Sequence, residues 1–368
     1  LRKIHGEKNV FDFTLGNPAV EPPEAFTREL RNVAEHPQPG MHRYMSNAGY
    51  EETRRAVAEV LSERSSQKVS AQHVVMTCGA GGALNVILKT ILNPGEEVII
   101  LSPYFVEYLF YIDNHGGIPR TVATHPETFQ PNLTAIEEAI NGKTRAIIIN
   151  SPNNPTGQIY DADTLTALGQ MLAQKSRAHG HTIYLVSDEP YRKIVFSDAT
   201  VPSIFKCYNE TIIATSYSKD ISIPGERIGF AAVNPAAAEK ATLMAGMALA
   251  NRILGFVNAP ALMQRVVACM QGMSVDIGEY QRKRDLLCDG LADAGYTFTR
   301  PAGAFYLFPR TPTDDDVSFV KALQEELILV VPGSGFAGPG HFRIAFCVDD
   351  RTIVNAMPGF KRVMQKYK

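Results

Sequence analysis

One lysine of the chain lies in a turn whose residue types suit the binding of a phosphorylated aldehyde. Lys219 ends the run Ser-Tyr-Ser-Lys at 216–219, directly after an apolar, β-branched segment at 211–215, and Arg227 follows in the next turn. A lysine amine can form an imine with an aldehyde, the charged fork of an arginine can hold a phosphate, and Ser216 adds a hydroxyl donor. The alternative is an ordinary lysine in a surface loop, so the assignment needs support from other segments.

Two further segments place polar residues directly after apolar runs. The run Ser-Pro-Asn-Asn-Pro-Thr-Gly at 151–157 follows the apolar segment 145–150, and Asp188 and Tyr191 follow the apolar segment 183–187. Taken alone, the first run indicates only a turn. In an open α/β sheet, however, ligands bind outside the carboxyl ends of the strands. We therefore expect these residues to meet the lysine turn in one crevice.

A glycine-rich turn at 77–83, Thr-Cys-Gly-Ala-Gly-Gly-Ala, lies between a predicted strand and a predicted helix. Free backbone N–H groups and the dipole of a helix that starts there suit a phosphate. The same turn partly fits a dinucleotide-binding motif, which also needs an acid near the end of the next strand for the ribose hydroxyls. That strand, at 97–101, ends in Ser-Pro-Tyr instead. The sequence thus disfavours a dinucleotide-dependent dehydrogenase.

The segments that must position these residues alternate between short apolar runs and stretches of helical period, which is the pattern of a sheet built from βαβ units. Several of the apolar runs lack polar alternation, as buried parallel strands do. The pattern predicts a large α/β domain. Its strands are expected at 73–77, 97–101, 145–150, 183–187, 211–215 and 228–233, and its helices at 83–91, 105–114, 133–140 and 164–178.

A smaller α+β domain is predicted after residue 275. Its expected elements are a long helix to 294, a hairpin at 296–308 around Pro-Ala-Gly at 301–303, a helix at 317–326, strands at 327–331 and 342–347, and a final helix at 350–368. The segment before residue 42 carries five prolines, too many for a regular element of its own, and we expect it to pack against the smaller domain. The predicted domains are residues 42–275 and residues 1–41 with 276–368.

Composition excludes several classes of protein. With 36 Lys and Arg against 38 Asp and Glu, the net charge of -2 gives no electrostatic reason to expect nucleic acid or an anionic membrane as partner. The longest apolar runs are far shorter than the roughly 20 residues that span a bilayer. Five widely spaced cysteines without a Cys-x-x-Cys pair disfavour disulfides and zinc, and the histidines show no metal-ligand spacing. We expect a cytoplasmic protein without a metal.

In this order and spacing, the segments resemble fold-type I pyridoxal-phosphate-dependent enzymes, specifically the class I/II aminotransferases of the aspartate aminotransferase superfamily. The resemblance covers nearly the whole chain, from Leu-Gly-Asn-Pro at 15–18, through Arg-Tyr at 43–44 and Ser-Pro-Tyr-Phe at 102–105, to Arg343. It implies a three-layer, mostly parallel sheet in the large domain and pyridoxal 5'-phosphate as cofactor. It also implies amino transfer between an L-amino acid and a 2-oxo acid by a ping-pong mechanism.

The resemblance implies a role for each matching residue. Lys219 would hold the cofactor and later move the proton, and Asp188 would keep the pyridine nitrogen protonated, so that electrons from Cα flow into the ring. Phe105 would stack on that ring. Arg343 would bind the substrate α-carboxylate. The remaining implied positions are Gly79, Ala80, Gly81, Asn154, Tyr191, Ser216, Ser218 and Arg227 for the cofactor, and Gly16 and Asn154 for the substrate.

One implied contact involves a second subunit. Tyr44 matches a tyrosine that reaches the phosphate of the neighbouring subunit's cofactor, so the resemblance implies a homodimer with shared sites. Arg252 lies near, but one position away from, an arginine that binds the substrate side chain in some dicarboxylate-specific relatives. An ordinary solvated arginine is the alternative there.

Two departures from the family pattern bear on the site. Cys78 and Ala80 occupy places where many relatives carry Ser or Thr, so the turn offers mainly backbone donors and the phosphate depends more on the serines at 216 and 218 and on Arg227. The chain has no Trp, and Phe105 stands where aspartate-specific relatives often carry one. A strict aspartate enzyme is therefore less favoured.

Other functions remain open at the level of sequence. A pyridoxal-phosphate lyase of the cystathionine β-lyase-like type would share Lys219, Asp188 and Arg343, and sequence separates it poorly from an aminotransferase. A cofactor-sensing domain of a transcriptional regulator would carry a basic DNA-binding module ahead of the segment at 15–18, where only a short stretch precedes it. The amino donor is not identified by any motif.

Overall fold

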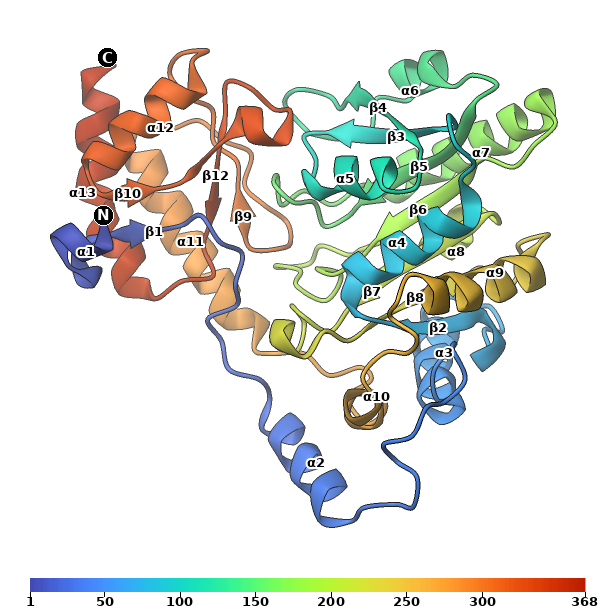
Figure 1. Ribbon diagram of the computed structural model, residues 1–368. Helices are drawn as coiled ribbons and strands as arrows, with labels where there is room; N and C mark the ends of the chain where they lie inside the picture. The colour runs from blue at the N-terminus through green and yellow to red at the C-terminus, as the bar shows by residue number, and fades with distance from the viewer. Residues whose placement is uncertain (368) are drawn as a thin grey trace.

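Residues 1–367, the part of the chain that the computed structural model describes, contain a central seven-stranded sheet (Figure 1). The strands lie in the order β2-β8-β7-β6-β5-β3-β4, and β8 runs antiparallel to both of its neighbours while the other adjacent pairs are parallel. Their bounds are β2 (Val74–Thr77), β3 (Glu97–Ser102), β4 (Ile118–Ala123), β5 (Thr144–Asn150), β6 (Tyr184–Asp188), β7 (Thr211–Ser216) and β8 (Gly229–Val233).

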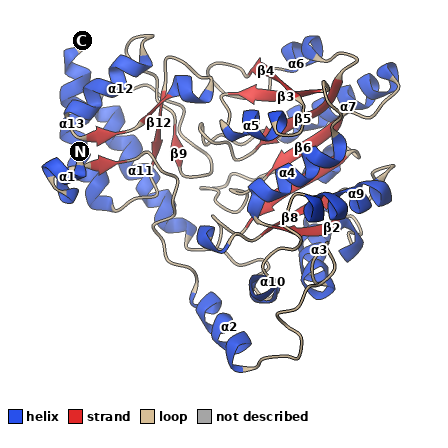
Figure 2. Cartoon of the chain, in the orientation of Figure 1, coloured by secondary structure: helices blue, strands red, loops and turns tan. Residues whose placement is uncertain are grey.

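Helices cover both faces of this sheet (Figure 2). Within β5, Ile147 and Ile149 join the core on one face and Ile148 joins the core on the other, all almost fully buried. These three layers and the mostly parallel sheet confirm the predicted fold class. One face is covered by α4 (Gly79–Ile91), α5 (Glu107–Asp113) and α9 (Lys240–Ile253), and the other by α3 (Glu51–Ser65), α6 (Leu133–Ala139), α7 (Ala162–His179), α8 (Ile204–Cys207) and α10 (Ala261–Ala268).

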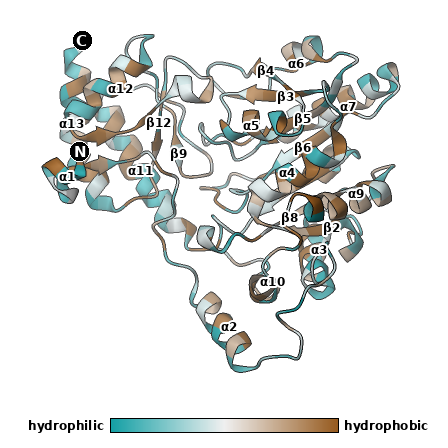
Figure 3. Ribbon diagram, viewed as in Figure 1, coloured by the Kyte–Doolittle hydropathy of each residue, from teal (hydrophilic) through white to brown (hydrophobic). Residues whose placement is uncertain are grey.

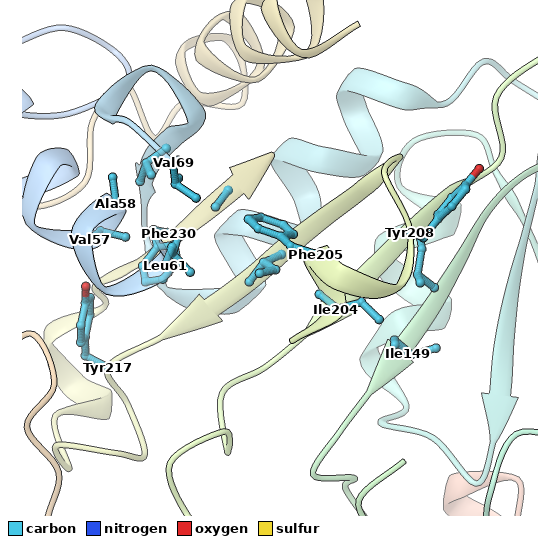
Figure 4. Packing of buried hydrophobic residues seen from close by; sticks show 14 of the residues in the cluster. Val57, Ala58, Leu61, Val69, Ile149, Ile204, Phe205, Tyr208, Tyr217 and Phe230 are labelled. Atoms are coloured by element: carbon cyan, nitrogen blue, oxygen red, sulfur yellow. The ribbon is translucent and has the colours of Figure 1, made fainter. Parts of the chain in front are cut away.

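Large apolar side chains fill the space between the sheet and α3. Figure 4 shows Val57 and Leu61 of α3 close to Phe230 of β8, with Phe205 of α8 in the same cluster. Burying side chains of this size stabilises the fold by roughly 1.5 to 3 kcal/mol each. This packing holds β8 and β7 in place, and the predicted lysine turn follows directly after β7.

A second, smaller sheet and core are formed mainly by the C-terminal part of the chain. The antiparallel order is β11-β12-β9, and β1 pairs in parallel with β10. Helix α13 buries Ile353 and Phe360 and exposes polar residues, and Figure 3 shows both hydrophobic and hydrophilic residues on this helix. The bounds are β1 (Phe11–Asp12), β9 (Tyr306–Leu307), β10 (Ile328–Leu329), β11 (Val331–Pro332), β12 (Phe342–Ala345), α1 (Arg2–His5), α11 (Ile277–Ala294), α12 (Asp316–Glu325) and α13 (Asp350–Lys366).

The N-terminal segment contains regular elements that the prolines were expected to prevent, so that prediction was wrong. Strand β1 pairs with β10, and α2 (Glu24–Glu35) is a helix of 12 residues. The prolines at 22–23 and at 37 and 39 stand before and after this helix rather than inside it. Phe26 of α2 packs into the core that contains α10, whereas β1 lies with the smaller sheet. The division into residues 42–275 and residues 1–41 with 276–368 stays a prediction.

Two other predictions about local structure failed. The edge strand β4 was missed because its outer positions are solvated, with Ile118 44% exposed, and it lacks a continuous apolar run. The prediction of a hairpin at 296–308 was wrong. Instead of pairing with each other, residues of this segment bond elsewhere: the Gly303 N–H donates to the Gly157 carbonyl and the Ala304 N–H to the Ile194 carbonyl.

Two properties of the described chain complete the description. Within residues 1–367, no helix combines the length and apolar character needed to cross a membrane. Nor does any group of three His, Cys, Asp or Glu side chains in that range come together as metal ligands.

Gly229, the first residue of β8, marks a close approach between two chain segments that border the predicted site. A Cβ there would lie 2.3 Å from the Thr215 carbonyl oxygen and 2.9 Å from the Gly79 Cα. We expect Gly229→Ala to lower the free energy of unfolding by about 1 to 3 kcal/mol, because the backbone must shift. Urea unfolding measures this change. The control is Gly225→Ala, whose added methyl meets nothing within 4 Å; equal losses in both variants would contradict the close approach as the cause.

Candidate active site

A cavity of about 480 Å³ lies where the carboxyl ends of the parallel strands meet the smaller sheet. Side chains from both sheets line it, since Asp188 ends β6, Ser216 ends β7 and Arg343 belongs to β12. The strand ends thus bring together segments that are far apart in sequence. The predicted site residues that line the cavity are Gly16, Ala80, Gly81, Phe105, Asn154, Asp188, Tyr191, Ser216, Ser218, Lys219, Arg227 and Arg343.

Lys219 reaches the N-terminal segment across the cavity. Its Nζ donates a hydrogen bond to the Gly16 carbonyl oxygen at 2.6 Å. Burial lowers the pKa of Lys219 to about 8, with Arg227 and Arg343 adding to this effect and Cys347 opposing it. A substantial fraction of this amine is therefore neutral near pH 8, as a nucleophile or a base requires.

Gly16 is a glycine because the chain passes very close to an aromatic side chain. A Cβ at this position would lie 1.9 Å from the Tyr306 hydroxyl oxygen. With a larger residue, either the Tyr306 side chain or the N-terminal segment, whose Gly16 carbonyl accepts from Lys219, would have to move.

The Asp188 carboxyl group is buried at the end of β6 with one oxygen unpaired. Its Oδ2 accepts a hydrogen bond of 2.6 Å from the Tyr108 hydroxyl, while Oδ1 has no partner among the described residues. Burial raises the pKa of Asp188 to about 7, against the lowering effect of the Tyr108 hydrogen bond. A buried carboxylate oxygen without a donor is costly. The site therefore fits a ligand that presents a charged N–H group to Oδ1.

Arg343 presents a buried guanidinium group to the same cavity. Its Nη1 donates to Asn154 Oδ1 at 3.0 Å and its Nη2 to the Thr14 carbonyl at 2.5 Å. Its Nε has no partner among residues 1–367. The rings of Tyr306 and Phe336 lie 4.8 and 4.6 Å from the guanidinium carbon. A planar cation held between two rings suits bidentate binding of a carboxylate.

Groups that suit an anion lie together where α4 begins. The glycine-rich turn is the first turn of this helix, which starts at Gly79 rather than at the predicted residue 83, so its free N–H groups belong to the helix N-terminus. Arg227 lies against it, with Nη2 3.0 Å from the position of a Cβ on Gly79. Ala80, Gly81 and the serines at 216 and 218 line the cavity, whereas Gly79 is not among the lining residues.

Aromatic and amide groups complete the walls. The hydroxyl groups of Tyr191 and Tyr306 share a hydrogen bond of 2.9 Å. Phe105 packs edge-on against Tyr108 with ring centroids 5.6 Å apart. The backbone N–H of Asn154 donates to Asn150 Oδ1, which fixes the loop that carries its side chain toward Arg343.

Several residues of the site were missed by sequence reasoning. Tyr108 and Thr14 bond to side chains of the cavity wall without lining the cavity themselves. Tyr108 stands three positions after Phe105, the spacing of one face of the helix predicted at 105–114, and this signal could have found it. Tyr306 and Thr14 carry no local motif and become neighbours of the site only through tertiary packing. Glu107 and Tyr111 line the cavity as well.

Two predicted or considered residues do not reach the cavity within this chain. Tyr44 is 89% exposed and lies beside a separate surface hollow with Met45 and Val257. Arg252 is exposed on α9 and does not line the cavity. The contact of Tyr44 with a partner subunit stays a prediction.

The sheet order and the cavity together define a class of protein. A seven-stranded sheet with one antiparallel strand is the arrangement of the pyridoxal-phosphate transferase fold, and solved aminotransferases share this fold. The family model described as aminotransferase class I and II matches residues 8–358. The chain belongs to this family.

Individual relatives agree with this assignment. The chain is 33% identical to a probable aspartate/prephenate aminotransferase of Thermus aquaticus over 360 residues, which covers 96% of this chain and 91% of the relative. A solved aminotransferase from Eubacterium rectale has a TM-score of 0.98 and 38% identity. The match covers 100% of this chain and 93% of the Eubacterium chain. The solved structure of aspartate aminotransferase from Thermus thermophilus with maleate has a TM-score of 0.85 and 29% identity. The match covers 96% of this chain and 92% of the Thermus chain. These relatives support an aminotransferase and not the lyase alternative.

The raised pKa of Asp188 has a consequence for stability that can be measured. In the cofactor-free protein the folded state holds a proton on Asp188 up to a pH of about 7, whereas the unfolded chain releases it near pH 4. This acid therefore makes the folded state progressively less stable as pH rises from 4 to 7, by at most about 4 kcal/mol. We expect Asp188→Asn to lose less stability across this pH range, as followed by thermal unfolding.

The control for this experiment is Asp198→Asn, which removes an exposed carboxyl group. Its stability should follow that of the unmodified protein at every pH. A pH dependence that is identical in Asp188→Asn and the unmodified protein would show that Asp188 ionises normally.

Proposed function

We propose that the cavity binds pyridoxal 5'-phosphate and that Lys219 holds it covalently while the enzyme moves amino groups between an L-amino acid and a 2-oxo acid. The observation that supports this proposal is that two unusual groups line one cavity. The buried Asp188 carboxyl group has an oxygen without a partner among residues 1–367, and the pKa of Lys219 is lowered to about 8. Perturbed titratable groups that converge in a cleft are typical of catalytic sites.

The residues that line the cavity fit both the ring and the phosphate of this cofactor. Asp188 Oδ1 would accept the ring N–H, and Phe105 would lie against the ring. Asn154 and Tyr191 would donate to the 3'-oxygen. The free N–H groups of residues 79–81, the serines at 216 and 218, and Arg227 would bind the phosphate. When bound, the cofactor supplies an electron sink that makes the substrate Cα proton labile.

The chain's own groups would handle the proton and the substrate. With a pKa of about 8, Lys219 can accept a proton at Nζ near neutral pH and return it, and the Gly16 carbonyl orients this amine. Arg343 would hold the α-carboxylate of the amino acid or 2-oxo acid by its paired N–H groups. The buried rings of Tyr306 and Phe336 keep water from that guanidinium and strengthen the ion pair.

We further propose a cytoplasmic homodimer with shared sites. The five cysteines are free thiols, as expected in a reducing compartment. Tyr44 is almost fully exposed although its ring is largely apolar, and it borders a hollow lined by Phe256 and Val257. A partner subunit that covers this surface would bury the ring and could bring its hydroxyl to a neighbouring phosphate.

The first test locates the covalent bond. We expect borohydride reduction of the holoenzyme, followed by peptide mapping, to find the cofactor on Lys219, and Lys219→Ala to lose at least about 10² to 10⁴-fold in kcat because its proton carrier is gone. The matched control is Lys240→Ala at an exposed lysine, which should keep full activity. A label on another lysine would refute the assignment.

The same holoenzyme separates amino transfer from lyase chemistry. Each amino acid is added alone, and the change of the cofactor absorbance and the release of ammonia are followed. We expect a spectral change and one equivalent of 2-oxo acid without ammonia.

The shared site is tested by mixing two variants. Tyr44→Phe should bind the cofactor roughly 10 to 100-fold more weakly, because a hydrogen bond to a charged phosphate is lost. Subunit exchange with Lys219→Ala should restore activity at low cofactor concentration, because one site of each hybrid dimer has both lesions and the other has neither. A fully active monomer in sedimentation experiments would rule out the shared site.

A further inference from the structure

One carboxyl group in the cavity has no role in the proposed chemistry. Glu107, the first residue of α5, lines the cavity, and its Oε2 is shielded from solvent without a hydrogen-bond partner among residues 1–367. Burial raises the pKa of this carboxyl group, whereas its own backbone N–H and the charge of Arg343 lower it. A glutamate that only stabilised the start of a helix would point its oxygens into water.

The Glu107 carboxyl group lies in the same cavity as the arginine proposed to bind the substrate. Burial raises the pKa values of Tyr111 and Tyr306, the charge of Glu107 adds to both shifts, and all three residues line the cavity. Tyr306 in turn packs against the guanidinium of Arg343. Glu107 and Arg343 thus line one cavity, and the charge of Arg343 lowers the pKa of the Glu107 carboxyl group.

The cations that line the cavity already have partners in the proposed function. Lys219 holds the cofactor, Arg227 binds its phosphate, and Arg343 binds the α-carboxylate. Gly81, on the wall near Tyr111, offers no side chain, and a Cβ there would lie 3.0 Å from the Tyr111 hydroxyl. Within the lining that this chain supplies, a second carboxylate on the substrate would find no further cation, and Glu107 would add a like charge.

We propose that Glu107 determines substrate specificity by favouring amino donors whose side chain ends in a hydrogen-bond donor or a positive charge over donors with a second carboxylate. This inference rests on the proposed function of the same cavity. The mechanism is a difference of affinities: a side-chain N–H satisfies the shielded Oε2, whereas a carboxylate adds like-charge repulsion and leaves Oε2 unpaired.

The test compares isosteric substrates and a dicarboxylate probe in the holoenzyme. In the unmodified enzyme, kcat/KM for glutamine should exceed that for glutamate, and maleate should bind weakly in a titration of the cofactor absorbance. In Glu107→Gln, the ratio of the two kcat/KM values should shift toward glutamate, and maleate should bind more tightly, each by roughly 10 to 100-fold. Glu107→Asp keeps the charge and should keep the preference for glutamine.

The matched control is Glu59→Gln, which makes the same change of net charge at an exposed position of α3. Its substrate ratio and its affinity for maleate should equal those of the unmodified enzyme. A preference for glutamate in the unmodified enzyme, or weaker binding of maleate by Glu107→Gln, would overturn the proposal, since Glu107 would then assist a second carboxylate. An unchanged ratio in Glu107→Gln would also overturn it.

Failure of the proposed function gives a different result. In that case, no amino acid would change the cofactor spectrum of the unmodified enzyme. If amino donors change the spectrum but Glu107→Gln changes neither the ratio of the two kcat/KM values nor the affinity for maleate, amino transfer is supported and the proposed role of Glu107 is refuted.

Discussion

The burial of the Asp188 carboxyl group at the end of β6 is the constraint on which the site depends. A carboxyl group without water needs donors, and the fold supplies one, the Tyr108 hydroxyl, while the Asn150 amide donates to the Asp188 backbone carbonyl. Because α5 must bring Tyr108 to this point, Phe105 and Glu107 of the same segment also come to the cavity. One buried carboxyl group thereby orders one wall of the cavity.

Part of the cavity wall is positively charged. Lys219, Arg227 and Arg343 line it, and the N-terminus of α4 adds partial positive charge. Burial lowers the pKa of Lys219, and the two arginines lower it further, because a third cation close to them is unfavourable. Ligands with a phosphate and a carboxylate reduce this repulsion. The two arginines therefore favour the neutral form of the Lys219 amine, and they are themselves suited to bind anions.

The sequence was sufficient for those parts of the fold and site that have local signals. Apolar runs located six of the strands of the large sheet, and polar residues directly after them located Asp188 and Lys219. Long-range packing has no such signal. Tyr306 reaches Tyr191 only because the smaller sheet lies against the larger one, and residues 302–304 bond to Gly157 and Ile194 rather than forming a hairpin. The solvated edge strand β4 lacks the apolar run on which strand prediction depends.

The N-terminal segment connects the two sheets through the site itself. Pairing of β1 with β10 fixes the chain just before Thr14, whose carbonyl accepts from Arg343, and two residues later the Gly16 carbonyl accepts from Lys219. A substrate carboxylate offers charged acceptors, which form stronger hydrogen bonds than a neutral carbonyl. Under the proposed function, a substrate carboxylate that took the Arg343 Nη2 donor would replace the Thr14 carbonyl, so that occupation of the site and the position of this segment would depend on each other.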